Sequence, residues 1–377
     1  MELKVLGIDL SKNLFQLHGV DPTGRAVLRK RLRLDQLLPF VAALPPCTIG
    51  IEACASAFHW AREFGRAGHV VRIISPQFVK PFVRGNKNDG NDAEAISEAV
   101  QRPSMRFVPL KTVAQQDIHS LHRCRQRLVN HRTALISQMR GVLLDCGIAF
   151  GKSASRARAT IPRILADADN GLTAMIREVL ASLFEFLGQL DGRIRDFDRR
   201  IEAVFREIPA CRRIAKVEGI GPKTATAIVA AVGDAKDFEN GRHMAAWLGL
   251  VPRHQASGGR TVMGGIGKRG DQHLRTLLVH GARAVMRVSA GRTDARSRWV
   301  NDLVARRGTN RAIVAVANKN ARIVWSLLAR GEDYRPAAAA WPLPSRVAGC
   351  SEEWGNRSDR RAESLATIAA TRGPAIG

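Results

Sequence analysis

The stretch LKVLGID, residues 3–9, is a short apolar run that ends in an acidic residue, Asp9. Its aliphatic composition predicts a β-strand. Two further strand-like segments follow at 15–20 and 26–34, and the turn sequence DPTG at 21–24 separates them. Three consecutive strands with short connections predict an antiparallel meander.

Helical and strand patterns alternate in the next part of the chain. A helical pattern covers 35–44, a buried strand covers 48–51, a second helix covers 57–67 and another strand covers 69–74. The order strand, strand, strand, helix, strand, helix, strand is that of an RNase H-like α/β domain. We therefore expect residues 1–110 to form such a domain.

Four acidic residues occupy positions suited to catalysis in that domain. Asp9 ends the first strand, Glu52 ends the fourth, and Asp89 and Asp92 stand three residues apart at the start of a helix expected at 92–100. We expect the four carboxylates to converge at one edge of the sheet. Carboxylates are the oxygen ligands that Mg²⁺ prefers, and two bound ions can clamp a phosphodiester displacement.

Each acid also has a simpler interpretation. The sequence DGND at 89–92 can be a turn that caps a helix, and Glu52 can be a buried or ion-paired acid. The strand order favours the metal site, because in this fold it brings all four acids to one place.

Two long helices are expected in the middle of the chain. Apolar residues recur in steps of three and four between 113 and 146 and, more regularly, between 176 and 208. A basic connector at 151–171 separates the two repeats. The pattern predicts an antiparallel coiled-coil arm over 111–208 that could also dimerise, although a purely structural core role remains open.

The segment after Pro209 predicts a DNA-binding turn between two helices. Its sequence VEGIGPKTATAIVAAVGD places Gly219 and Gly221 before an Ala-rich helix, as in a helix-hairpin-helix, where backbone N–H groups approach a phosphate. A tight packing turn is the alternative. Further helices are expected at 241–248, 271–288, 295–307 and 310–330. We expect the tail, 335–377, to be disordered because of its Pro, Ala, Arg and Ser content.

The stretch from Gly249 to Val285 holds the candidate nucleophile, Ser257. We interpret it as a flexible loop in which a hydroxyl stands beside glycines and cations, a combination that suggests phosphoryl chemistry. An ordinary surface turn has the same composition. The candidate nucleic-acid contacts here and in the preceding turn are Gly219, Gly221, Lys223, Arg260, Lys268, Arg269 and Arg275.

Two nucleotide-binding motifs are excluded in this stretch. GIGKRG at 265–270 has the spacing of a dinucleotide fingerprint, but no expected strand leads into it and no acid follows about 20 residues later. A P-loop would need glycine where Val262 stands and Ser or Thr where Arg269 stands.

The net charge of +25, from 59 Lys and Arg against 34 Asp and Glu, predicts a polyanionic partner. The cations concentrate in two segments, with 11 against 2 acids at 106–163 and 16 against 3 at 253–330. Aromatic content of 5% favours contact with duplex DNA phosphates over base stacking.

The six cysteines form no zinc-binding spacing, and neither a signal peptide nor a membrane-spanning run is present. We therefore expect reduced core cysteines in a cytoplasmic protein that has no membrane partner.

Five motifs together resemble a known family, the IS110 insertion-sequence transposases, in particular their IS1111 subgroup. The motifs are GIDLSKN, IEACASAFHWAR, KNDGNDAEAI, VEGIGPKTA and GLVPRHQASGGRTVMGGIGKRGDQHLRTLL. They occur in family order and span roughly residues 3 to 330, whereas the tail matches nothing recognisable.

The resemblance implies an architecture and a mechanism. A RuvC-like DEDD domain, a coiled-coil linker and a mostly helical C-terminal transposase domain at 209–334 would form a nucleoid-associated site-specific recombinase. A structured non-coding bridge RNA would direct it, and it would work as a homo-oligomer, a dimer or tetramer. By the same resemblance Ser257 attacks the phosphodiester, and Mg²⁺ held by Asp9, Glu52, Asp89 and Asp92 assists the transfer.

Two other functions remain open at this stage. The first is an RNase H-like, structure-selective nuclease in which the Ser257 loop merely binds phosphate. The second is a non-catalytic DNA-architectural or regulatory protein that uses the helix-hairpin-helix and the coiled coil.

Overall fold

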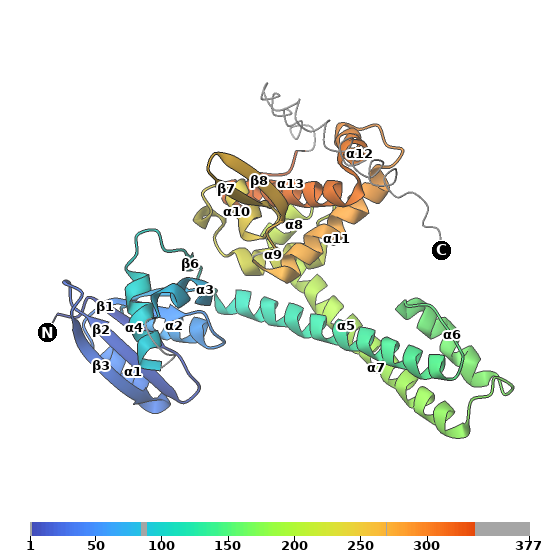
Figure 1. The fold of residues 1–377 in the computed structure, drawn as a ribbon, viewed down its shortest axis with the longest axis horizontal. Helices are drawn as coiled ribbons and strands as arrows, with labels where there is room; N and C mark the ends of the chain where they lie inside the picture. The colour runs from blue at the N-terminus through green and yellow to red at the C-terminus, as the bar shows by residue number, and fades with distance from the viewer. Residues whose placement is uncertain (1, 84–88, 269, 336–377) are drawn as a thin grey trace, which may run out of the picture.

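The structure is a computed structural model that describes residues 2–83, 89–268 and 270–335 (Figure 1). The side chains of Asp89, Arg260 and Thr261 fall outside this description. Arg269 and nearly all of the tail expected to be disordered also lie outside the described residues.

A six-stranded mixed sheet forms the N-terminal domain, with the order β3-β2-β1-β4-β5-β6. β1 pairs antiparallel with β2 and parallel with β4, β2 pairs antiparallel with β3, and β4 pairs parallel with β5. The expected meander is therefore confirmed, and the order is compatible with an RNase H-like domain. The short strand β6, antiparallel to β5, was not expected. The strands are β1 (Val5–Asp9), β2 (Leu14–Val20), β3 (Ala26–Arg33), β4 (Thr48–Glu52), β5 (Val70–Ile74) and β6 (Phe107–Val108).

Helices cover both faces of this sheet. Leu6 and Ile8 of β1 pack with the buried residues of α1 (Leu34–Ala42) and α2 (Ala57–Arg66). Val5, on the alternate side of the same strand, packs with the core residues of α4 (Asp89–Val100). The two cores follow from the side-chain alternation of a strand. Two short helices, α3 (Pro76–Val79) and η1 (Lys80–Phe82), precede α4.

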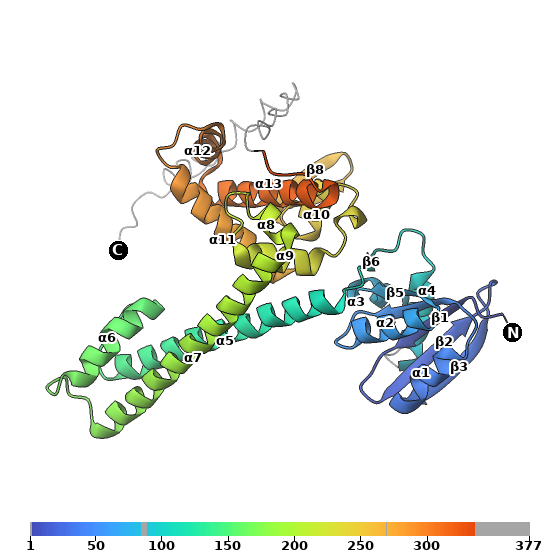
Figure 2. The ribbon, with the colours of Figure 1, turned by 180° about the vertical axis from the view of Figure 1, so that it is seen from behind.

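Two long helices, α5 (Val113–Asp145) and α7 (Ala174–Glu207), form an arm that projects from the rest of the molecule (Figures 1 and 2). Side chains of Thr112 and Thr173 accept hydrogen bonds from the first turns of the two helices and so fix where each begins. Leu135, Met139, Leu180 and Leu187 belong to the buried core of the arm. The two expected helices are thus confirmed within two residues at each end.

The connector of the arm contains a helix that the sequence pattern did not predict. It contains the helix α6 (Ala154–Ala166), whose Ala157 and Ile161 are buried in the arm core. Arg158 of α6 and Arg132 of α5 both donate to the buried Asp191 of α7, at 2.7 and 3.1 Å. This acid therefore ties three helices together.

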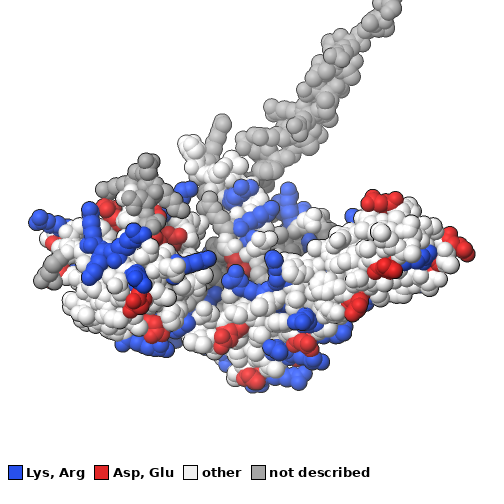
Figure 3. All heavy atoms as spheres, turned by 90° about the horizontal axis from the view of Figure 1, so that it is seen from below, with Lys and Arg blue, Asp and Glu red and all other residues white. Residues whose placement is uncertain are grey.

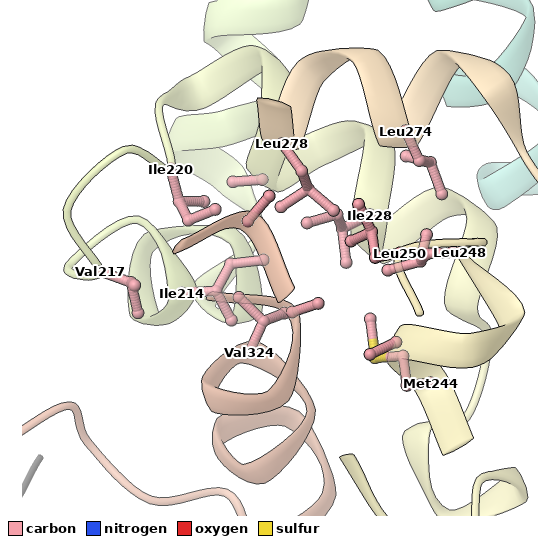
Figure 4. Close-up of a cluster of buried hydrophobic side chains, with 14 of the residues drawn as sticks. Ile214, Val217, Ile220, Ile228, Met244, Leu248, Leu250, Leu274, Leu278 and Val324 are labelled. Atoms are coloured by element: carbon pink, nitrogen blue, oxygen red, sulfur yellow. The ribbon is translucent and has the colours of Figure 1, made fainter. Parts of the chain in front are cut away.

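The C-terminal domain is a cluster of helices around a core of small and branched residues (Figure 4). Ile214, Ile228, Leu248, Leu278 and Val324 come from different segments and meet in this core. Its helices are α8 (Pro209–Ile214), α9 (Pro222–Val232), η2 (Ala235–Asp237), α10 (Gly241–Trp247), α11 (Gln272–Ser289), α12 (Ala295–Arg307) and α13 (Thr309–Arg330).

The root of the arm is part of this domain. His122 of α5 is buried against α9, and its Nε2 lies 2.9 Å from Thr226 Oγ1. The His273 ring, at the start of α11, lies 5.7 Å from the ring of His122. Burial, together with the neighbouring His273 and Arg125, lowers the pKa of His122 to about 4. The joint between arm and domain is therefore built on neutral histidine rings.

The cysteine expectation is only partly right. Cys47 and Cys211 are buried, but Cys54, Cys124 and Cys146 are exposed, and all five are free thiols. Within the described residues, no helix is both long and apolar enough to cross a bilayer.

Candidate functional site

Two of the predicted acids lie side by side at the carboxyl edge of the sheet. Ile8 of β1 and Ile51 of β4 are partners in the parallel ladder, so Asp9 and Glu52 follow them at the ends of adjacent strands. Both side chains are half-buried. Neighbouring strands in a sheet are about 4.8 Å apart, so the two carboxylates share one small region of this edge.

The packing of α4 brings the third acid to the same face. A Cβ on Gly7 would lie 2.2 Å from the Ala93 carbonyl oxygen, and one on Gly50 would lie 3.0 Å from Ile96. The α4 backbone can therefore approach β1 closely only because residue 7 lacks a side chain. Asp9 is two residues beyond Gly7 and points to the same face of the sheet.

Asp92 directly precedes Ala93, the residue that contacts Gly7. It is half-buried in the first turn of α4. His18 of β2 holds the helix in place, because its Nδ1 lies 3.0 Å from Ser97 Oγ. Burial lowers the pKa of His18. The fold thus places Asp9 and Glu52 at one sheet edge and Asp92 in the first turn of the helix that covers the same face.

Asp89 starts α4, so DGND at 89–92 is the first helical turn and not a separate turn before the helix. Its side chain lies outside the described residues. Among the side chains that are described, no three His, Cys, Asp or Glu residues stand close enough together to hold a metal ion. The donor set, carboxylates at one edge, matches a hard divalent cation in kind. The ligand set expected from the sequence includes Asp89.

Ser257 lies on a β-hairpin and not in the flexible loop expected from the sequence. β7 (Pro252–Ser257) and β8 (Arg260–Ile266) are antiparallel, and Ser257 pairs with Arg260 across a two-residue turn. Gly258 and Gly259 form that turn with φ of 54° and 77°. Two consecutive positive φ values are the mark of a type I′ turn, which glycine adopts most easily. Ser257 is therefore exposed at the hairpin tip.

The remaining glycines of this stretch do not form a phosphate-sized loop either. Gly264 and Gly265 belong to β8, and a Cβ on Gly270 would lie 1.9 Å from the Trp247 carbonyl oxygen. Gly270 is therefore a close-packing position against α10. Lys268, with φ of 55°, is the one non-glycine residue of positive φ in the described chain.

The hairpin separates cations that are close to Ser257 only in the sequence. Lys268 follows β8 at the base of the hairpin, whereas Ser257 stands at the tip, and the seven residues of β8 span roughly 20 Å. Arg275 is half-buried and donates to the Leu248 carbonyl oxygen at 3.2 Å. Lys268 therefore lies far from Ser257 along the hairpin, and the Arg275 guanidinium is bound to a backbone carbonyl. Arg260 is the cation that pairs with Ser257 in the backbone register.

The Gly219 turn, between α8 and α9, is packed against α11. A Cβ on Gly219 would lie 2.8 Å from the Gly281 carbonyl oxygen, which supports the packing-turn interpretation for this glycine. Gly221 is exposed at the N-cap of α9. Lys223 pairs with Asp198 of the arm at 2.9 Å. Gly221 is therefore the exposed glycine at this helix N-terminus.

The sequence reasoning missed a basic edge strand. β3, at the edge of the sheet, carries four exposed cations: Arg29, Lys30, Arg31 and Arg33. Figure 3 shows Lys and Arg side chains gathered over the N-terminal domain, at the left of that view. Charges on an edge strand block sheet-to-sheet pairing and also attract phosphates. The run RKRLR was the available signal, but it fell outside the two basic segments counted above.

Comparison with known proteins identifies the family. Residues 6–148 match the transposase model DEDD_Tnp_IS110, and residues 211–298 match the model of the IS116/IS110/IS902 transposase family. Over 337 residues the chain is 50% identical to a protein of Pseudomonas aeruginosa described as "Probable family 20 transposase", which covers 89% of this chain and all of that relative. The chain belongs to the IS116/IS110/IS902 transposase family.

Two further relatives agree with this assignment. The transposase for insertion sequence element IS1111A of Coxiella burnetii is 45% identical over 89% of this chain and 93% of its own length. The transposase for element IS1328 of Yersinia enterocolitica is 39% identical over 87% of this chain and 97% of its own. The protein is therefore an enzyme that cuts and rejoins DNA, and its DEDD domain indicates a requirement for divalent metal. Family membership sets aside the non-catalytic alternative.

Proposed function

We propose that this transposase recombines DNA through a covalent link to Ser257, assisted by divalent metal on Asp9, Glu52, Asp89 and Asp92. The observation that carries the proposal is the edge of the sheet that holds Asp9 and Glu52, which we call the acid edge. β1 and β4 place two carboxylates side by side, and the close contact of α4 at Gly7 brings Asp92 to the same face.

The chemistry divides between the two regions. The Ser257 oxygen attacks phosphorus, a bond from Oγ to phosphorus forms, the bond from phosphorus to a sugar oxygen breaks, and that sugar oxygen takes up a proton. Attack by a sugar hydroxyl of another strand then reverses the exchange and frees Ser257. Mg²⁺, as two ions on the carboxylates, would stabilise the charge on the phosphate oxygens when bound.

The exposure of Ser257 supports a nucleophile role. Every residue of β7 is exposed, and a Cβ built on Gly258 or Gly259 at the hairpin tip would meet no described atom within 4 Å. A hydroxyl in this position can reach a bulky DNA duplex. The exposed cations of β3 supply positive charge on the N-terminal domain, where they can contact DNA phosphates.

The finer parts of the proposal rest on family resemblance. A structured non-coding bridge RNA would guide the transposase to its DNA sites, and the active form would be a homo-oligomer. The net charge of +25 suits binding to RNA as well as DNA. RNA that co-purifies with the protein should map to the non-coding end of its own element. Recovery of random fragments alone would remove the guide from the proposal.

The experiment for the acid edge uses charge-removing, nearly isosteric variants. Asp9→Asn, Glu52→Gln and Asp92→Asn should each lower DNA cutting at least about 100-fold, because even outer partners of metal ligands contribute 10- to 100-fold. Glu63→Gln, an acid on α2 that pairs with Arg66, is the matched control and should cut normally. Metal titration followed by calorimetry should show weakened binding only in the first three. Wild-type cutting by all three in excess EDTA would contradict the proposal.

The runner-up function is a structure-selective nuclease that cuts with metal-activated water, with Ser257 only near the phosphate. Ser257→Ala separates the two functions, since a nuclease would still release free DNA ends.

A further inference from the structure

A cavity of about 740 Å³ opens beside the acid edge. It lies between α1, α2 and the segments that follow β1 and β4. The lining residues that matter here are Leu10, Lys12, Phe15, Cys54, His59 and Trp60. This volume falls in the range of small-ligand sites in proteins.

The floor of the cavity is aromatic and held in place by packing. Trp60 is 7% exposed, its ring stacks on Phe64 at 5.5 Å between centroids, and Phe15 meets it edge-on at 5.6 Å. The His59 ring meets Trp60 at 5.1 Å and is itself exposed. The exposed His59 ring, held against the buried Trp60, is the ring of this lining on which a planar base can stack.

The lining of the cavity holds one exposed cation, Lys12, that can pair with a phosphate. Lys12 and Ser11 are exposed on the lining, and the single acid there, Asp35, has Arg33 at 3.8 Å to offset its charge. A ligand with an apolar planar part and a negative part fits this distribution. A nucleotide has both.

The cavity and the acids belong to the same two chain segments. Leu10, Ser11 and Lys12 directly follow Asp9, and Cys54 stands two residues after Glu52. Consecutive Cα atoms are about 3.8 Å apart, so the cavity wall begins within one or two residues of each acid. The acids point to the α4 face, whereas Leu10 packs with the core on the α1 and α2 face. A DNA strand that crosses this edge would contact both the acids and the cavity.

We propose that this cavity takes one unstacked nucleotide of the DNA strand, next to the phosphate that is cut. The inference rests on the proposed function, because it takes the acid edge as the cutting site. DNA is the occupant that the observations favour, since the cavity continues from the edge where DNA is cut. Withdrawing a neighbouring base from the stack bends the backbone and exposes the phosphate between them. If the cavity selects that base, the protein itself adds a DNA sequence preference to the one that the guide RNA would supply.

The test uses Cys54 as a built-in reporter at the rim. Cys124→Ser, Cys146→Ser and Cys350→Ser in the full chain leave Cys54 as the exposed thiol, because Cys47 and Cys211 are buried. Burial raises the pKa of Cys47 to about 11 and that of Cys211 to about 12, so both exchange slowly with disulfides. Duplexes carrying the element's end, with a disulfide tether on one base at a time, are then incubated with this protein and its co-purifying RNA.

Cross-linking should peak at one nucleotide adjacent to the cut, at least about 10-fold above the other positions. The matched protein that retains Cys146, at the end of α5, instead of Cys54 should lack this peak. Uniform cross-linking across the duplex would overturn the proposal, as would no cross-link at all. A peak on tethered RNA in place of DNA would also overturn it, since it would assign the cavity to a different nucleic acid.

Two exposed lining residues give an independent readout. Lys12→Ala and His59→Ala should each lower the Cys54 cross-link at that nucleotide and slow DNA cutting about 10-fold, with an unchanged Tm. Wild-type values for both variants would overturn the proposal. Asp9→Asn distinguishes it from the proposed function. This variant should keep the cross-link peak, whereas failure of the proposed function would appear as normal cutting by Asp9→Asn.

Discussion

The acid edge and the Ser257 hairpin place their functional groups by opposite means. Asp9, Glu52 and Asp92 are half-buried at strand and helix ends that pack closely enough to demand glycine at Gly7. Ser257 stands at the end of an exposed ribbon, held by the turn and by pairing of β7 with β8. The acids are thus held by the packing of the domain, whereas the serine is held by the turn and the strand pairing of an exposed hairpin.

The largest expected effect of this difference is on the free energy of unfolding when a glycine is replaced by alanine in each region. Gly7→Ala places a methyl group 2.2 Å from the Ala93 carbonyl oxygen, so α4 must shift and the free energy of unfolding of the N-terminal domain should fall by roughly 3 kcal/mol. Gly265→Ala in the hairpin has no atom within 4 Å and should be nearly neutral. Urea unfolding followed by circular dichroism measures both. Equal stability of the two variants would contradict the contrast between packed acids and an open hairpin.

The stability of the joint between α5 and the C-terminal domain should depend on pH. His122 is neutral when folded, with a pKa near 4, and in the unfolded chain its pKa is about 6.5. Between these values the unfolded chain binds the extra proton, so the free energy of unfolding falls as pH is lowered from 6.5 towards 4, by about 2 kcal/mol. Stability curves of wild type and His122→Gln at several pH values measure this slope.

His280→Gln is the matched control for that measurement, because His280 is exposed on α11. The slope should shrink in His122→Gln and persist in His280→Gln. Identical slopes in both variants would show that the joint does not depend on a neutral His122.

The smallest expected effect is at the hairpin turn. Gly258→Ala should cost about 1 kcal/mol of hairpin formation, because an L-residue resists φ of 54° there. Gly258→Asn should cost less, since Asn tolerates this region. The readout is hydrogen exchange of the peptides that contain β7 and β8, with Tm unchanged in both variants. Faster exchange in the Asn variant than in the Ala variant would rule out the turn geometry as the cause.

The same contrast explains which features the sequence could predict. The spacing of apolar residues predicted the meander and helices such as α12 at 295–307. It also predicted that Asp9 and Glu52 end their strands. Apart from the half-buried Ile266, the described side chains of the hairpin are exposed, including Val262 and Met263, so no alternation of buried and exposed positions marked its strands. Glycine was misread for the same reason. Gly270 and Gly219 look like loop residues in sequence, and only their tertiary neighbours show that they are packing positions.

The acids were predictable in kind because they end strands whose order was also predictable. The close packing of α4 against β1 and β4 could not be predicted. The need for Gly7 and Gly50 arises only when a helix packs across both strands. α6 was missed because the connector's Arg and Ser residues hide two buried positions, Ala157 and Ile161.

The most direct test of the account is a search for DNA covalently attached to Ser257. Wild-type protein, with its co-purifying RNA, is incubated with a nicked duplex carrying the element's end, denatured, and digested with trypsin. The account predicts a nucleotide-bearing peptide spanning 254–260, HQASGGR, by mass spectrometry. The adduct should be absent in Ser257→Ala and present in Ser120→Ala, an exposed serine of α5. Free DNA ends produced at the wild-type rate by Ser257→Ala, with no adduct on any peptide, would contradict it.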